Sequence, residues 1–221
     1  MEITLKNGQR VKLLTAEKYC PEDIVVAVDV PYYAYDEATY ENPEIDLLLE
    51  GKLTKIYNDR VTNIFKSSFR DYTPIEEISL PNAVRIEALA FHACSNLKKI
   101  YFPKLEYIGD QAFNACSGLG NLYFPSVKTI GTYAFGGVWR TEEMVFDNIV
   151  DFNDMTFYQC WSLKRLIIRT KDIVPTIGSR SFYQCYHILG EVHDTINPDG
   201  LQDGYIYVPD NMVEQYKSAT N

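Results

Sequence analysis

The 221-residue sequence has no apolar run approaching the roughly 18 residues that a membrane-spanning helix needs, so we predict no membrane insertion. Its opening, Met-Glu-Ile-Thr-Leu-Lys, lacks the basic start and apolar stretch of a secretion signal, so we expect no signal peptide in this chain. Lysine and arginine form no cluster and the formal net charge is −9, which argues against a nucleic-acid partner.

Motifs for catalysis and metal binding are missing as well. The sequence holds no Gly-x-Ser-x-Gly, no His-Glu-x-x-His and no phosphate-binding glycine loop, and its three histidines have no nucleophile or carboxylate at motif spacing. The five cysteines form no short Cys-x-x-Cys pair of the kind that zinc sites use. We therefore expect a protein that is not an enzyme, with no catalytic residue, cofactor or metal.

What the sequence does have is one pattern that recurs every 22 residues. An aliphatic or methionine column is spaced without a gap: Ile56, Ile78, Ile100, Leu122, Met144 and Leu166. A second column is always phenylalanine after a small residue: Phe69, Phe91, Phe113, Phe135, Phe157 and Phe182. Such columns indicate stacked coils whose layers interdigitate. Only the last unit is three residues longer, between Arg169 and Thr176, where Pro175 predicts a surface loop.

Each unit contains one clear strand signal. In Leu97 to Pro103 the alternation predicts a short strand with Ile100 and Phe102 on one face and Lys99 and Tyr101 on the other. Proline then ends the strand because it cannot donate to a sheet ladder. The return stretch, with its Ala-Phe pair, predicts a tight turn and a short helical segment.

The phrase Ile-x-Phe-Pro-x-Leu-x-x-Ile-Gly-x-x-Ala-Phe-x-x-Cys-x-x-Leu resembles the BspA-type leucine-rich repeat of bacterial surface proteins and of phage or prophage proteins. Residues 97–118 fit it throughout. The sequence departs from it where Asp59, Asp147 and Arg169 replace proline and where residues 136–138 replace the cysteine-containing turn. The resemblance implies an α/β repeat fold: a leucine-rich-repeat solenoid of short parallel strands with turns or short helical segments.

We divide the chain into three regions: residues 1–52, 53–204 and 205–221. The first is an N-terminal β cap region with an acidic, tyrosine-rich linker, and it carries 11 acids against 5 bases, which predicts a solubilising surface. Asn7-Gly8 is a strong hairpin signal between strands near Ile3 and Val11, and residues 24–30 suit a third strand. Residues 31–46 fit a linker or an ordered loop.

The second region is the six repeats, and the third is a strand-helix cap that closes the solenoid. Residues 205–208 predict one more strand, and Pro209 then starts a helix with Met212, Val213 and Tyr216 on one face. Phage-type relatives generally continue past this point, so the resemblance implies further chain beyond Asn221.

Four cysteines, Cys94, Cys116, Cys160 and Cys185, occupy one repeat column and should be buried as small hydrophobes. Neighbouring coils lie about 4.8 Å apart, which brings Cys94 with Cys116, and Cys160 with Cys185, inside disulfide Cα limits. Side chains in a stacked column point in parallel, however, and a disulfide needs β-carbons within about 4.5 Å. We predict free thiols.

Two surface columns are candidates for partner binding. The first is the outward strand column Tyr57, Ser79, Tyr101, Tyr123, Val145 and Ile167, flanked by Lys55, Glu77, Lys99, Asn121, Glu143 and Arg165. In leucine-rich repeats this is the concave face, where ligands often bind, although tyrosine is also simply a good strand residue. The second is Ser95, Ser117, Trp139, Trp161 and Tyr186. It suits sugar stacking or a subunit contact, or else packing beneath the final loop or the cap.

From these columns we select eight partner-binding candidates: Tyr57, Lys99, Tyr101, Tyr123, Arg165, Trp139, Trp161 and Tyr186. Residues 15–30 resemble a phrase that recurs in phage tail-associated proteins. We therefore predict a non-catalytic binding module of a phage or prophage tail, located on a virion or cell surface. Its partner would be a protein or glycan of a host surface, or a neighbouring virion protein.

Two alternatives stay open. A BspA-like bacterial adhesin should carry a secretion signal and a wall anchor. A purely structural assembly protein should bind no ligand and form a defined oligomer, and homo-oligomerisation is compatible with every one of these hypotheses.

Overall fold

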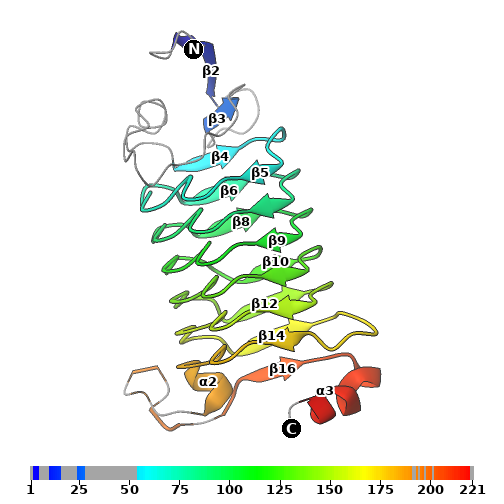
Figure 1. The fold of residues 1–221 in the computed structure, drawn as a ribbon. Helices are drawn as coiled ribbons and strands as arrows, with labels where there is room; N and C mark the ends of the chain where they lie inside the picture. Colours follow the sequence, from blue (N-terminus) through cyan, green and yellow to red (C-terminus); the bar gives the residue numbers. More distant parts are fainter. Residues whose placement is uncertain are drawn as a thin grey trace.

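The computed structural model describes the strands at residues 2–4, 10–15 and 24–27, and then residues 54–190, 193, 195–196, 198–200 and 202–219. From residue 54 onward the chain winds into stacked coils (Figure 1). Six coils each add one short strand to each of two faces, and the strands that pair within a face run parallel. The solenoid expected from the 22-residue pattern is confirmed.

The first face, here called the front sheet, carries the strands predicted from the Leu-x-x-Ile-x-Phe-Pro phrase. It is divided into two parts, β4(Lys55–Tyr57), β6(Glu77–Ser79) and β8(Lys99–Tyr101), then β10(Leu122–Phe124), β12(Glu143–Phe146), β14(Arg165–Ile168) and β16(Tyr205–Tyr207). All of these pairings are parallel, and Ile56 lies opposite Ile78 as Leu122 lies opposite Met144. Residues 22 apart in sequence are therefore neighbours in space.

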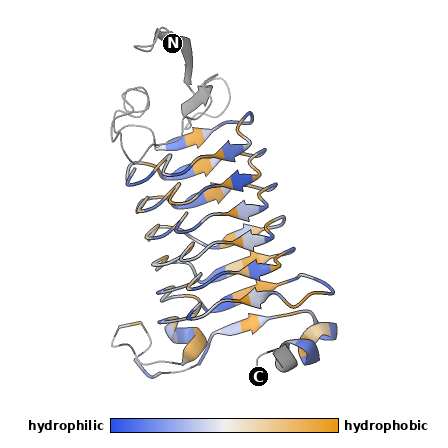
Figure 2. Cartoon of the chain, in the orientation of Figure 1, coloured by the Kyte–Doolittle hydropathy of each residue, from blue (hydrophilic) through white to orange (hydrophobic). Residues whose placement is uncertain are grey.

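The second face is a six-stranded parallel sheet of two-residue strands. It consists of β5(Asn63–Ile64), β7(Arg85–Ile86), β9(Tyr107–Ile108), β11(Thr129–Ile130), β13(Asp151–Phe152) and β15(Thr176–Ile177). The inward residue of each strand from β5 to β13 is buried. Figure 2 shows the same hydrophobic and hydrophilic segments recurring in successive coils.

The return stretch of each coil is a turn, and the short helical segment predicted for it does not form in the coils between residues 54 and 185. Each turn has two residues with positive φ four positions apart, such as Leu89 (60°) and Ala93 (59°), which break any right-handed helix. Their amides donate to the next coil, Leu89 to the Asp110 carbonyl and Ala93 to the Asn114 carbonyl. These coil-to-coil bonds hold the left-handed conformation at residues other than glycine, and Gly137 is the one glycine among these turn positions in the described residues.

The phenylalanine column forms one continuous stack in the core. Phe91 and Phe113 have ring centroids 5.2 Å apart, and Phe113 and Phe135 are 5.5 Å apart, with interplanar angles of 4° and 3°. Phe69 and Phe157 extend the stack at either end. The prediction that these phenylalanines share one interior column is confirmed. This column forms the core on which the front sheet packs.

The cysteine column is also as predicted, because Cys94, Cys116, Cys160 and Cys185 are buried and are not joined in disulfides. Each thiol does more than fill space: it donates to the carbonyl of a core phenylalanine in the preceding coil, as Cys116 Sγ does to Phe91 O at 2.9 Å. Burial raises the pKa of the Cys160 thiol to about 12. Cys20 lies outside the described residues.

The ends carry the expected strands. β1(Glu2–Thr4), β2(Arg10–Thr15) and β3(Ile24–Ala27) form an antiparallel sheet, and β3 contacts β4. The Asn7-Gly8 turn and the linker at 31–46 lie outside the described residues. After β16 come η2(Asp210–Met212) and α3(Val213–Ala219), with Met212 buried and Tyr216 packed on the core. The proposed region boundaries at 52 and 204 remain predictions.

Candidate functional site

The outward column of the front sheet, here called the tyrosine row, consists of Tyr57, Ser79, Tyr101, Tyr123, Val145, Ile167 and Tyr207. Tyr57 is 42% exposed, and Tyr101 and Tyr123 are each 57% exposed. The strand register places Tyr123, Val145, Ile167 and Tyr207 side by side. Sequence reasoning missed Tyr207, although the phrase Tyr-Ile-Tyr-Val-Pro repeats the register of Lys-Ile-Tyr-Phe-Pro.

One member of the row is not available to a partner. Val145 is only 6% exposed, yet it does not belong to the core cluster. It stands on the outward side between Tyr123 and Ile167, so its larger neighbours cover it. The row is therefore closely packed along its C-terminal half, and this packing restricts the rotamers of the exposed rings.

The charged residues that flank the row are paired across coils. Lys99 Nζ lies 3.0 Å from a carboxylate oxygen of Glu77, and Arg165 Nε lies 2.7 Å from one of Glu143. Exposed pairs of this kind contribute roughly 0–1 kcal/mol. Both candidate cations thus already have a protein partner, so the tyrosines are the row's most available contact groups.

A hydrogen bond and an ion pair link Tyr123 to the two following coils. The Tyr123 hydroxyl donates to Asp147 Oδ2 at 2.6 Å, and Arg169 Nη1 lies 3.5 Å from Asp147 Oδ1. The hydrogen bond to Asp147, with smaller contributions from desolvation and the carboxylate charge, raises the pKa of Tyr123. Asp147 occupies a position where other coils have proline, so the substitution that breaks the repeat creates a polar connection.

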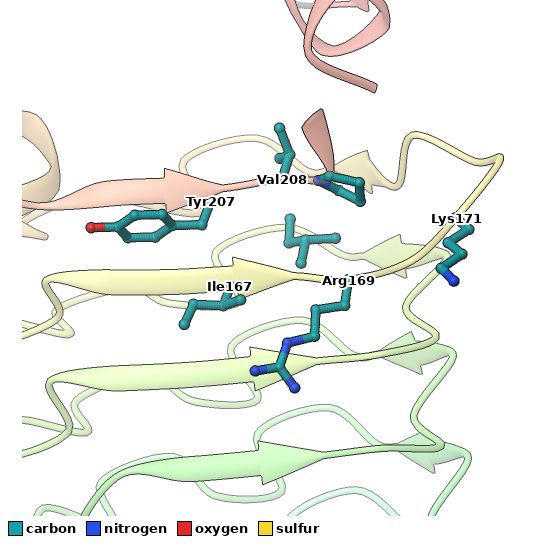
Figure 3. Close-up of a pocket in the computed structure, with 7 residues that line it drawn as sticks. Ile167, Arg169, Lys171, Tyr207 and Val208 are labelled. Carbon is teal, nitrogen blue, oxygen red and sulfur yellow. The ribbon is translucent and has the colours of Figure 1, made fainter. Parts of the chain in front are cut away.

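A pocket of about 330 Å³ lies at the C-terminal end of the row. Its lining comes from β14, from the loop that follows it and from β16 with the residues after it: Ile167, Ile168, Arg169, Lys171, Tyr207, Val208 and Pro209. In Figure 3 the Tyr207 ring extends along β16 and Ile167 projects from the adjacent strand. The sequence did not indicate this pocket, because its walls are about 40 residues apart along the chain.

The second candidate column lies after the turns, away from the tyrosine row. Trp139 and Trp161 stack with centroids 4.9 Å apart and an interplanar angle of 9°. Trp139 is 43% exposed, but Tyr186 is only 8% exposed and its ring lies 4.6 Å from that of His193. Of these three rings Trp139 is therefore the one open to a partner, while Tyr186 packs against the segment after α2(Tyr186–Leu189).

A polar cluster fixes the C-terminal end. His187 Nδ1 lies 2.5 Å from Asp203 Oδ1, and Lys164 Nζ lies 3.0 Å from Asp203 Oδ2. Desolvation alone would raise the pKa of Asp203, but hydrogen bonds and charges of Lys164 and His187 outweigh it and lower that pKa. The cluster ties α2 to the residues that begin β16, a pairing that the sequence spacing did not reveal.

Comparison with protein families decides which repeat this is. The BspA-type leucine-rich repeat region, in six copies, matches residues 50–106 and 84–195, which is more than half of the chain. The chain belongs to the BspA-type leucine-rich repeat family. Its fold suggests a binding or adhesion module, since repeat solenoids of this family are generally non-catalytic scaffolds. Comparison with curated proteins gives no match.

Three solved structures are similar to this BspA-type chain. A leucine-rich repeat protein of Treponema pallidum has 14% identity and a TM-score of 0.49, with 96% of this chain and 94% of that chain covered. A leucine-rich cell surface protein of Faecalibacterium prausnitzii has 15% identity and a TM-score of 0.42, with 84% and 52% covered. A leucine-rich repeat protein of Bacteroides ovatus has 17% identity and a TM-score of 0.39, with 74% of this chain and 49% of that chain covered. This chain thus spans about half the length of the latter two.

Two further features of the BspA-type solenoid concern metal and membrane. Within the described residues, no group of three or more histidine, cysteine or acidic side chains is arranged to hold a metal ion. In that same part of the chain, no helix has the length and apolar character needed to cross a membrane.

Proposed function

We propose that this chain is a non-catalytic binding module of a phage or prophage tail that contacts a host surface or a neighbouring virion protein through the tyrosine row. The observation that carries the proposal is the exposure of Tyr57, Tyr101 and Tyr123 on strands backed by a stacked core. Tyrosine provides a large contact area at low entropic cost, and a preordered surface loses little further entropy on binding.

The residues that flank the row serve a secondary role in this proposal. Lys99 and Arg165 neutralise the two glutamates that flank the row, since each is paired with a carboxylate of the preceding coil. Trp139 forms a second contact area with Trp161 stacked beneath it, and Tyr186 supports Trp161 at a ring distance of 6.5 Å. The phage assignment draws on the resemblance of residues 15–30 to a phrase in tail-associated proteins.

The test is binding of the fluorescently labelled protein to a panel of bacterial cells, measured by flow cytometry. The double variant Tyr101→Ala/Tyr123→Ala should lose at least about 2 kcal/mol of binding free energy, which is roughly thirtyfold in affinity. Tyr183→Ala is the matched control, because Tyr183 is 48% exposed but belongs to the turn side. Equal binding by all three proteins would refute a role for the row.

The adhesin hypothesis is supported by the family match over residues 50–195. The genomic context separates it from the first proposal. Tail or lysis genes beside this gene favour the phage assignment, whereas a secretion signal and a wall anchor in the full reading frame favour the adhesin. A protein that binds no cell or virion component but forms a defined oligomer would instead be a structural assembly protein.

A further inference from the structure

The coil that carries Trp139 departs from the repeat around its turn. Gly136 and Gly137 stand where every other coil has a larger residue, and Trp139 stands where the two preceding coils have Ser95 and Ser117. Trp139 does not belong to the core cluster. Maintaining the solenoid therefore does not explain why a large indole replaces serine here.

The Trp139 indole is held in place before any ligand arrives. Trp161 stacks on one of its faces, with ring centroids 4.9 Å apart and an interplanar angle of 9°. Trp161 is in turn packed against Tyr186 at 6.5 Å and His193 at 5.7 Å. Trp139 is nevertheless 43% exposed. A ligand that contacts it meets a preordered aromatic surface, which lowers the entropic cost of binding.

The open face of the indole points toward the preceding coil. Trp161 belongs to the following coil and the two indoles are nearly parallel, so the other face of Trp139 is turned to the side of Ser117. The Ser117 hydroxyl lies 3.5 Å from the Ser95 carbonyl, which shows that the coils adjoin in this column. A serine side chain is too small to cover an indole, and among the described rings only Trp161 stacks on Trp139. A flat ligand ring on this face would continue the stack by one layer.

A polar group borders the same turn from the preceding coil. A Cβ added at Gly136 would lie 2.5 Å from Asn114 Nδ2, and one added at Gly137 would lie 3.6 Å from Trp139 Nε1. Both side chains therefore border the glycine pair. The Asn114 side-chain amide has no hydrogen-bond partner in the part of the chain that the structure describes, so it is available to a ligand in the layer of its own coil.

The surroundings of the open face are polar and uncharged. Within residues 86–138 the only exposed large apolar side chains are Tyr101 and Tyr123, and both belong to the front sheet. Arg140 stands in the column next to that of Trp139. The members of these two columns in the preceding coils are Ser95, Asn96, Ser117 and Gly118. A protein-docking patch is a contiguous apolar area, whereas one aromatic face among neutral polar groups suits a sugar.

Resting on the proposed binding function, we propose that the open face of Trp139 binds a neutral pyranose ring of the glucose or N-acetylglucosamine type within a surface polysaccharide. Such a ring has C–H groups on its faces and equatorial hydroxyls around its edge. The C–H face packs on the indole above Ser117, and the edge hydroxyls form hydrogen bonds with Asn114 and Ser117. A mostly apolar contact with a few placed polar groups is the usual arrangement of small-molecule sites.

The experiment uses the fact that the chain has two tryptophans, one on each side of the stack. The whole chain, labelled with nitrogen-15, is titrated with cellotetraose and with chitotetraose, and the two indole N–H signals are followed by NMR. Sorbitol is the matched ligand, because it carries the hydroxyls of glucose on an open chain without a flat face. The Trp139 signal should shift more than that of Trp161, and the tetramers should bind at least about tenfold more tightly than sorbitol.

Four variants test the geometry. Trp139→Ala should weaken tetramer binding at least about tenfold, and Trp139→Phe should restore most of it because an aromatic face returns. Ser117→Leu keeps Trp139 but covers its open face with a branched side chain, so it should weaken binding at least about fivefold. Tyr183→Ala, which removes another exposed aromatic ring of the turn side, should have no effect.

The outcomes separate this site from the proposed function. Failure of both tetramers to bind, equal binding of sorbitol, or unchanged binding by Ser117→Leu overturns the inference. Preference for tetraproline would assign the face to a protein segment, and preference for a glucuronate tetramer would overturn the neutral assignment. If no tetramer binds but Tyr101→Ala/Tyr123→Ala still reduces cell binding, the proposed function survives alone. If the tetramers bind and the tyrosine variant has no effect on cells, this inference survives alone.

Discussion

Replacing Phe113 by alanine should destabilise the solenoid more than any surface substitution. Phe113 is fully buried and contacts three rings, stacking on Phe91 at 5.2 Å and Phe135 at 5.5 Å and lying 6.4 Å from Phe102. Truncation of a buried phenylalanine costs about 3–5 kcal/mol through lost burial and the cavity left behind. Each lost ring pair adds roughly 0.5–1.5 kcal/mol, so we expect the upper part of that range.

The position in the stack provides the matched comparison. Phe182 ends the phenylalanine column, is only partly buried and stacks on a single ring, that of Phe157 at 5.5 Å. Phe182→Ala should therefore cost about 1–2 kcal/mol, in proportion to the smaller area it removes from water. Tyr101→Ala, at an exposed position, should stay within about 0.5 kcal/mol of the wild type.

Urea denaturation followed by circular dichroism measures all three free energies of unfolding, provided that the slopes agree between variants. In a repeat protein each coil is stabilised mainly by its two neighbours, so a central change disrupts two interfaces and a terminal change one. A cost for Phe113→Ala equal to that of Phe182→Ala, or below about 1 kcal/mol, would refute this reasoning.

Three further predictions concern the thiols, a glycine and the C-terminal cluster. In a Cys20→Ser background, the four column thiols should resist a thiol reagent at pH 8 until the protein unfolds, because all four are buried and burial raises the pKa of Cys160 to about 12. Rapid labelling of the native protein would contradict this. Gly109→Ala should lower the free energy of unfolding by about 1–3 kcal/mol, since the added Cβ would meet the Ala88 amide nitrogen at 2.5 Å, whereas Gly120→Ala should be tolerated. Equal melting temperatures of the two variants would be evidence against this prediction. Asp203 has a lowered pKa, so its carboxylate stabilises the C-terminal polar cluster fully at pH values above the usual aspartate pKa of about 3.9. This stabilisation is lost as the pH falls through the lowered pKa. Asp203→Asn should abolish this acid dependence, measured by hydrogen exchange of α2.

The sequence alone predicted the features that depend on one-dimensional spacing. Columns such as Phe91 and Phe113 repeat without a gap, so the stacked core and the parallel strands followed directly. The conformation of the turns did not, because Leu89 and Ala93 are residues that would fit a helix. They become left-handed only because their amides bond to the next coil, an interaction between residues about 21 apart.

The candidate site was predictable in the same uneven way. Exposure of Tyr101 and Tyr123 follows from strand alternation, which the sequence contains. The burial of Tyr186 depends on where the segment with His193 returns, and the link from Asp147 to Arg169 joins two separate departures from the repeat. Neither has a local signal, because each arises from the way that irregular segments meet across coils.

The arrangement of the phenylalanine column can be measured directly by nuclear Overhauser contacts between selectively labelled rings. The coil-on-coil register predicts that protons of the Phe113 ring contact those of both Phe91 and Phe135, and that Phe91 and Phe135 do not contact each other. A Phe113 ring without contact to either neighbour would show that positions 22 apart do not stack, and the front sheet with its tyrosine row and pocket would then lose its structural basis.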